Sequence, residues 1–156
     1  PEQWKAAVII SAHPGLTDAQ EKQRRLEHDQ KWAERFQKEE WDSLMQAWNA
    51  QEVFKHDHFH FPREEKNYQR QQIIQTLTQG SLLRQDDLRQ QIACLHIPIL
   101  WITGSLDQRY CQLAQALSFH HPLSRWEKIE QAGHRAPWMQ PHLFSQIVQT
   151  FLRQIN

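Results

Sequence analysis

Two short apolar runs, separated by a long polar block, constrain the fold of this chain most strongly. They are AAVIISA at residues 6–12 and IPILWITG at residues 97–104. Runs of this length, rich in β-branched residues, favour strands that are buried on both faces, as in a parallel sheet. A third strand is predicted at residues 124–131 (SRWEKIEQ), and its charged residues indicate a position nearer the edge of the sheet.

The block between the first two strands is predicted to be helical. Residues 17–48 lack Pro and Gly, and a thin apolar stripe at helical spacing predicts two helices, with Thr17 or Asp18 as the N-terminal cap. Residues 64–83 predict a further polar helix. A helical block of roughly 75 residues is too long for a simple crossover between strands, and we interpret it as a lid.

The remaining elements complete an α/β pattern. Residues 110–118 predict a short amphipathic helix, and a last helix is predicted to begin at Pro141, a favourable residue for a first turn. The alternation of strands and helices predicts an α/β fold with parallel strands and a helical lid insertion. We expect three segments: 1–16 as a core strand and turn, 17–93 as the lid, and 94–156 as the C-terminal core. Because the sequence begins at Pro1 just before a strand, we also expect a fragment or a processed product.

Composition excludes several classes of function. The 18 basic and 18 acidic residues balance, which gives no electrostatic basis for binding nucleic acid or an anionic membrane. No apolar run approaches the roughly 20 residues that span a bilayer, and the start does not resemble a secretory signal. Cys94 and Cys111 have no CxxC spacing and predict reduced thiols. These features together predict a cytoplasmic protein.

Alternating histidines in KHDHFHFP, residues 55–62, raise the question of a metal site. His56, His58 and His60 would share one face of an extended segment, yet side chains two residues apart rarely converge on one ion. We therefore predict a solvated loop at the edge of the lid, with no metal and no cofactor.

Asp107 and His134 are the strongest candidates for chemistry. Asp107 follows the strand at 97–104, and His134 follows the strand at 124–131 within the tripeptide AGH. Functional residues of open α/β sheets lie at the carboxyl ends of strands, so these two side chains are predicted to meet. A carboxylate in that position holds one imidazole nitrogen and leaves the other able to accept a proton.

Three segments of the chain resemble the menaquinone-pathway SHCHC synthases, a family with the α/β-hydrolase fold. They are SAHPGLTDAQEKQRRLEHDQKWAERF at 11–36, LWITGSLDQRY at 100–110, and EQAGHRAPWMQP at 130–141. The resemblance covers nearly the whole chain and corresponds to the lid and last strands of the family. The HPGL turn with its arginine-rich helix is the more specific signature, whereas the Asp and His segments are generic to the superfamily.

The resemblance implies a lyase that uses a Ser-His-Asp triad and no cofactor. It eliminates pyruvate from 2-succinyl-5-enolpyruvyl-6-hydroxy-3-cyclohexene-1-carboxylate (SEPHCHC). By the same resemblance, Asp107 orients His134, His134 activates the serine, Arg25 binds substrate carboxylates, and Trp48 faces the substrate. A further family arginine has no clear counterpart, and Arg63 and Arg70 are the candidates. Without this resemblance, we would interpret Arg24 and Arg25 as part of a solvated helix face.

The serine of that triad is missing from this sequence. The seven serines are Ser11, Ser43, Ser81, Ser105, Ser118, Ser124 and Ser145, and none lies in GxSxG. In this fold the nucleophile precedes the lid, so we predict that residues 1–156 alone are inactive and expose a sheet edge through which they self-associate. Two other interpretations stay open: a different α/β-hydrolase, such as an esterase or C–C hydrolase, and a non-catalytic interaction module. The module would be favoured if Asp107 and His134 lay more than about 4 Å apart.

Overall fold

The computed structural model describes residues 4–155, and the chain divides into two compact units. The sheet unit comprises Pro1–Pro14, Glu52–Phe59 and Arg89–Asn156, and the helical unit comprises Gly15–Gln51 and His60–Leu88. The predicted lid, 17–93, therefore differs from the helical unit chiefly in Glu52–Phe59, which belongs to the sheet unit. Residues 1–3 of the predicted segment 1–16 lie outside the described residues. Within 4–155, no helix has the length and apolar character needed to cross a membrane.

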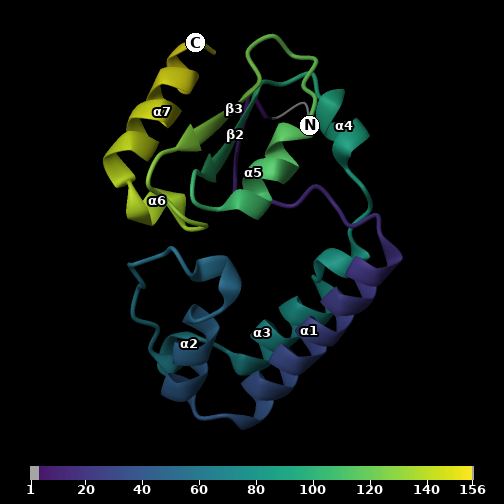
Figure 1. The fold of residues 1–156 in the computed structure, drawn as a ribbon, viewed down its shortest axis with the longest axis vertical. Coiled ribbons are helices and arrows are strands. Elements are labelled where there is room, and N and C mark those ends of the chain that lie inside the picture. The colour runs from purple at the N-terminus through teal and green to yellow at the C-terminus, as the bar shows by residue number, and fades with distance from the viewer. Residues whose placement is uncertain (1–3, 156) are drawn as a thin grey trace. The chain divides into compact units, whose positions relative to one another are not determined.

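Three parallel strands form the sheet, which confirms the predicted α/β class (Figure 1). They are β1 (Ala7–Ile10), β2 (Ile99–Gly104) and β3 (Arg125–Ile129), in the order β1-β2-β3. Both pairs are parallel. All six residues of β2 are buried, as predicted, and β3 is only partly buried and lies at an edge, as its charges predict. The expectation that the first strand is buried on both faces is wrong: among the described residues β1 pairs with β2 alone, is half-buried, and has Ile10 exposed.

The two faces of β2 pack against different helices of the sheet unit. Leu100 and Ile102 lie in an apolar cluster with Phe151 of helix α7 (Pro141–Arg153). Thr103 faces the other way, and its hydroxyl contacts Cys111 of α5 (Gln108–Gln115) at 3.3 Å. Helices therefore cover both faces of the central strand, as the uninterrupted apolar sequence of β2 requires.

The helical unit is built on α1 (Ala19–Lys38), α2 (Trp41–Asn49) and α3 (Arg70–Gln79). Asp18 caps α1 by accepting a hydrogen bond from the backbone amide of Glu21 at 2.8 Å. The core of this unit consists of buried aromatic and aliphatic side chains from α1 and α2, namely Trp32, Phe36, Trp41 and Leu44. The single helix predicted at 64–83 is instead a short 3₁₀ turn, α3 and another 3₁₀ turn.

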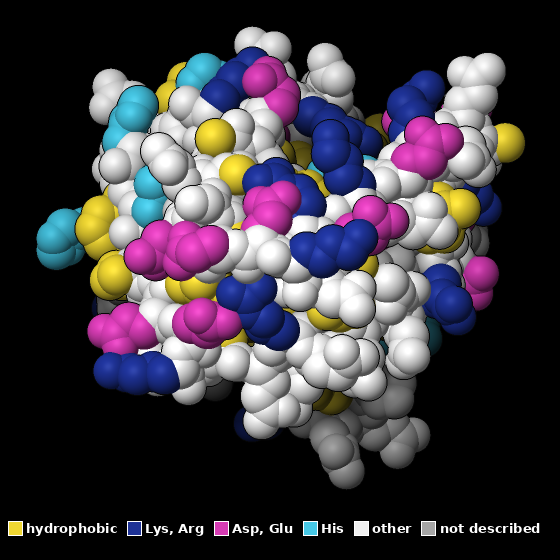
Figure 2. Space-filling view, turned by 90° about the horizontal axis from the view of Figure 1, so that it is seen from below, with side chains coloured by type: hydrophobic (Ala, Val, Ile, Leu, Met, Phe, Trp, Pro, Cys, Tyr) yellow, Lys and Arg dark blue, Asp and Glu magenta, His cyan; other side chains and the backbone are white. Residues whose placement is uncertain are grey.

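Shorter elements connect these parts. They are η1 (Glu52–Phe54), η2 (Glu65–Asn67), η3 (Leu82–Arg84), α4 (Arg89–Ala93) and α6 (Ala136–Met139). On one face of the molecule, Lys and Arg side chains are interspersed with Asp and Glu (Figure 2), in keeping with the formal net charge of zero. The predicted self-association through the edge of the sheet stays a prediction.

Candidate active site

The structure brings Asp107 and His134 together at the carboxyl ends of β2 and β3. Asp107 is the N-terminal cap of α5, three residues after the end of β2, and His134 lies in the loop between β3 and α6. The distance from His134 Nδ1 to Asp107 Oδ2 is 2.7 Å. Two residues that are 27 positions apart in sequence therefore form a hydrogen bond, because their strands are parallel neighbours.

This hydrogen bond sets the tautomer of the imidazole. A carboxylate only accepts hydrogen bonds, so Nδ1 of His134 carries the proton that it donates to Asp107. In the neutral ring Nε2 then has a free lone pair, and it has no hydrogen-bond partner in the described part of the chain. The side chains are 20% exposed for His134 and 7% for Asp107, so the carboxylate is shielded while the ring retains access to solvent. The pair can accept a proton at Nε2 and stabilise the resulting imidazolium.

Gly104 allows the loops that carry Asp107 and His134 to approach each other closely. A Cβ on Gly104 would lie 2.1 Å from the carbonyl oxygen of Gly133 and 2.3 Å from that of Ala132, and these main-chain atoms have little room to move. Main-chain hydrogen bonds join the same two loops, from Leu106 to Ala132 and from Ser105 to Ile129, each at 2.9 Å. Gly104, which ends β2, therefore leaves room for the loop that carries His134.

Other groups of the sheet unit surround His134. The ring of Tyr110 packs edge-on at 4.5 Å between centroids, and the ring of Phe54 lies at 5.7 Å. Ser11, directly after β1, donates its hydroxyl to the carbonyl oxygen of His134 at 2.7 Å. This contact holds the main chain of the loop, and it engages the hydroxyl of Ser11, the serine directly after β1.

Asp57 is a residue near His134 that the sequence analysis did not single out. Its side chain is fully buried, and Oδ1 accepts a hydrogen bond from the backbone amide of Arg135 at 3.2 Å. Burial raises the pKa of the Asp57 carboxyl, and the Arg135 amide and the positive charges of Arg135 and His134 oppose that shift. The prediction of a solvated loop at 55–62 is wrong at Asp57, because its side chain is buried. The alternating histidine pattern gives no sign that this aspartate points into the protein.

Two predicted substrate-binding residues, Arg25 and Trp48, belong to the helical unit. Arg25 Nε donates to Asp29 Oδ2 at 2.7 Å on α1, and Asp29 is buried and also accepts from the Ser81 hydroxyl at 2.5 Å. The remaining nitrogens of the Arg25 guanidinium extend from a partly exposed side chain. Trp48 packs edge-on against Trp32 at 4.8 Å.

Arg70, the other predicted substrate-binding residue, caps the C-terminus of α1. Its Nη1 donates to the carbonyl oxygens of Phe36 at 2.9 Å and Glu39 at 2.7 Å, and its Nε pairs with Glu65 at 2.5 Å. Carbonyls at the end of a helix lack partners within the helix, so this arrangement stabilises α1. The alternative candidate, Arg63, accepts the indole N–H of Trp41 at its carbonyl oxygen. A role for either arginine in binding substrate stays a prediction.

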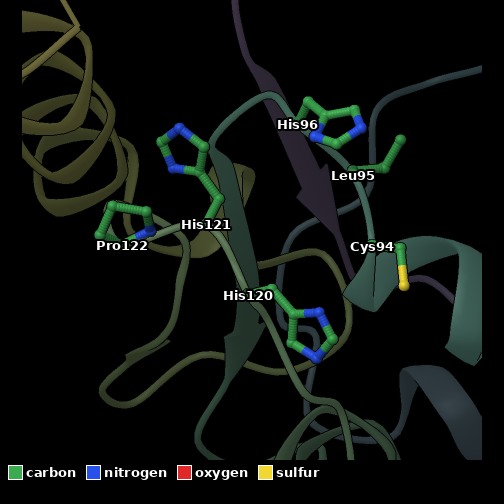
Figure 3. A pocket seen from close by; sticks show the side chains of 6 residues that line it. All are labelled: Cys94, Leu95, His96, His120, His121 and Pro122. Carbon is green, nitrogen blue, oxygen red and sulfur yellow. The ribbon is translucent and has the colours of Figure 1, made fainter.

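A surface pocket of the sheet unit lies away from the Asp107–His134 pair. It is lined by Cys94, Leu95, His96, His120, His121 and Pro122 (Figure 3). His96 precedes β2, so the pocket is at the amino end of that strand, whereas Asp107 follows the carboxyl end. The three imidazole rings do not converge on one point in Figure 3, and residues 4–155 contain no group of three or more His, Cys, Asp or Glu side chains that could hold a metal ion.

The fold and the pair define part of an α/β-hydrolase fold. The structure of MenH from S. aureus is similar with a TM-score of 0.77 and 18% identity, over 97% of this chain and 59% of that one. An esterase from Thermogutta terrifontis is similar with a TM-score of 0.61 and 19% identity, over 97% of this chain and 56% of that one. At these identities the likeness concerns the fold alone.

Sequence similarity identifies the relatives more narrowly: the chain is homologous to the 2-succinyl-6-hydroxy-2,4-cyclohexadiene-1-carboxylate (SHCHC) synthases. It is 29% identical to the synthase of Pectobacterium atrosepticum over 93% of this chain, and 31% identical to that of Yersinia pestis over 94%. The chain spans 57% and 54% of the length of these relatives. No protein-family model matches the chain. The resemblance to this family predicted from the HPGL, Asp and His segments is confirmed.

Proposed function

We propose that Asp107 and His134 form the histidine–aspartate part of an SHCHC synthase active site. The observation that carries the proposal is the 2.7 Å hydrogen bond from His134 Nδ1 to Asp107 at the carboxyl ends of adjacent strands. Homology to SHCHC synthases supports the choice of reaction.

In the proposed reaction Nε2 of His134 takes the proton of a serine hydroxyl, and the serine oxygen removes a ring proton of SEPHCHC. The electron pair of that C–H bond forms the new ring double bond, and the C–O bond to the enolpyruvyl group breaks. The departing enolate takes the proton of the His134 imidazolium and leaves as pyruvate, so the serine hydroxyl and the neutral imidazole are both restored. The buried Asp107 carboxylate stabilises the imidazolium meanwhile. None of the seven serines in this sequence lies in GxSxG, so the serine comes from residues outside it.

Arg25 is proposed to bind a carboxylate of this substrate. Its contact with the buried Asp29 fixes the guanidinium at Nε, and the two terminal nitrogens are then oriented without further loss of side-chain freedom. Arginine is suited to carboxylates because its planar fork donates two parallel hydrogen bonds. Trp48 and Arg70 are proposed as further substrate contacts, beside their packing against Trp32 and their hydrogen bonds to the end of α1.

A chimera tests the proposal. The N-terminal part of the Pectobacterium synthase, which precedes its match to this chain, is joined to residues 1–156, and pyruvate release from SEPHCHC is measured. We expect turnover by the chimera, none by residues 1–156 alone, and a loss of about 10³-fold or more in His134→Ala. His142→Ala, a change in the first turn of α7, is the matched control and keeps full activity. Undiminished turnover in His134→Ala contradicts the proposal.

The same chimera distinguishes SHCHC synthase activity from the activities of other α/β-hydrolases. Ester hydrolysis without pyruvate release indicates an esterase. If Arg25→Ala leaves turnover of SEPHCHC unchanged while α1 remains folded, binding of a polycarboxylate substrate by Arg25 is contradicted. The geometry that would favour a non-catalytic module, a separation beyond hydrogen-bond reach, is not what the described residues show.

A further inference from the structure

We propose that Asp57 is a positioning residue for His134, holding the main chain on both sides of the histidine. Its Oδ1 accepts the amide N–H of Arg135, the residue after His134, at 3.2 Å. The same oxygen packs against Gly133, the residue before it, so closely that a Cβ there would lie 2.3 Å away. One carboxylate oxygen therefore contacts the backbone directly before and directly after the histidine.

The burial of Asp57 separates this contact from an ordinary surface hydrogen bond. The side chain has no exposed surface, and Oδ2 has no hydrogen-bond partner among the described residues. The nearest cation to Oδ2 is Arg135 Nε, at 3.9 Å. A buried carboxylate with one unpaired oxygen costs folding free energy. Among the described residues, the hydrogen bond from the Arg135 amide offsets part of this cost.

The turn that carries Asp57 also contacts the loop of His134 through the side chain of Arg135. Asp57 donates its own amide to the carbonyl oxygen of Phe54 at 2.9 Å, which closes the turn after η1. The guanidinium of Arg135 lies 3.8 Å above the ring of Phe54, and that ring is 5.7 Å from the ring of His134. Phe54 and Asp57 thus hold Arg135 by its side chain and by its backbone.

The segment Glu52–Phe59 therefore has a role in the sheet unit although it lies between two stretches of the helical unit in sequence. Asp57 and Arg135 are 78 positions apart. A role of Asp57 in catalysis rests on the proposed function of His134. The contact between Asp57 and the loop does not rest on that function.

Amide hydrogen exchange and histidine NMR test the proposal on residues 1–156. In Asp57→Ala, we expect exchange of the Arg135 amide to rise about 10-fold or more while that of Leu100 in β2 is unchanged, because the acceptor alone is lost. The Nδ1 proton resonance of His134 should broaden or shift as its hydrogen bond to Asp107 loosens. Asp57→Asn keeps the acceptor oxygen, so the Arg135 amide should stay within about 3-fold of the unsubstituted protein. Glu52→Gln, which changes an exposed carboxylate on the same segment, is the control.

Unchanged Arg135 exchange and an unchanged His134 resonance in Asp57→Ala overturn the proposal. If that variant does not fold, Asp57→Leu fills the space without an acceptor and is measured instead. An Arg135 amide that exchanges freely in the unsubstituted protein overturns the proposal without any variant. In the chimera, Asp57→Ala should lower kcat about 10- to 100-fold with little change in KM. NMR changes with no pyruvate release from any chimera leave the positioning role standing and contradict the proposed function.

Discussion

The polar pairs of the candidate site in the sheet unit and the ion pair along helix α1 in the helical unit span different distances in sequence. In the sheet unit the pairs Asp107–His134 and Asp57–Arg135 join residues 27 and 78 positions apart. In the helical unit Arg35 and Glu39 pair across four positions of α1, and this hydrogen bond raises the pKa of Arg35 and lowers that of Glu39. Local pairs follow from helical spacing, whereas the pairs of the candidate site need the sheet.

The largest expected effect belongs to the sheet unit. In the chimera, Asp107→Asn should lower kcat by about 10³- to 10⁴-fold, because an amide no longer holds the His134 tautomer as a carboxylate does. Thermal unfolding should show that the variant remains folded. Asp42→Asn, an exposed change in the first turn of α2, is the matched control. A loss of less than about 10-fold would show that the pair does not act as a triad component.

The next effect tests whether the helical unit has a core of its own. Leu44 has no exposed surface, and its truncation in Leu44→Ala should lower the free energy of unfolding by about 2 to 5 kcal/mol. Hydrogen exchange should accelerate in α1, α2 and α3 before it does so in β2, because the lost contacts belong to that cluster. Equal acceleration in β2 would mean that the two units unfold together. Leu106→Ala, at an exposed leucine, provides the comparison.

Gly104→Ala probes the close approach of the two loops in the sheet unit. The added Cβ meets the carbonyl oxygens of Ala132 and Gly133, so we expect destabilisation of about 1 to 3 kcal/mol and a lengthened Asp107–His134 contact. Chemical denaturation and the Nδ1 proton resonance of His134 measure the two consequences. Gly80→Ala is the control, since its Cβ would be 3.0 Å from one carbonyl oxygen at the end of α3. If the two variants are equally stable, the packing argument for Gly104 is wrong.

The smallest expected effect is a pH dependence in the helical unit. Hydrogen bonds from the Ser43 and Asp42 amides lower the pKa of the Glu40 carboxyl below the ordinary value of a glutamate. A lowered folded-state pKa means that the stabilisation is present above the unfolded pKa and is lost as the pH falls through the folded pKa. Glu40→Gln should therefore be less stable than the unsubstituted protein at pH 7, and the difference should shrink below about pH 4. Denaturation at both pH values measures it, with Glu34→Gln, an exposed carboxylate of α1, as control.

The strands and the histidine–aspartate pair were accessible to sequence analysis, and parts of the surroundings were not. Apolar runs predicted β1 and β2, although only β2 is fully buried, and the positions after β2 and β3 predicted that Asp107 and His134 meet. Asp57 could not be found in this way, because a single aspartate among alternating histidines has the composition of a solvated loop. Its burial comes from contacts with Gly133 and Arg135, which no local pattern encodes.

Arg70 illustrates the same limit in the helical unit. The sequence places it within the helix predicted at 64–83 as a candidate for binding substrate, but its donors close the end of α1 at Phe36 and Glu39, more than 30 positions earlier. The type of a side chain determines which hydrogen bonds it can make. The packing of α3 against α1 determines which of these hydrogen bonds Arg70 makes.

The sequence by itself determined the class of fold, the parallel strands and the residues of the candidate pair, because apolar periodicity and the position after a strand are local properties. The tertiary structure decided how closely those residues approach, which nitrogen of His134 is held by Asp107, and that Glu52–Phe59 joins the sheet unit. These features depend on hydrogen bonds and close contacts between segments distant in sequence, and such contacts exist only after the strands have paired.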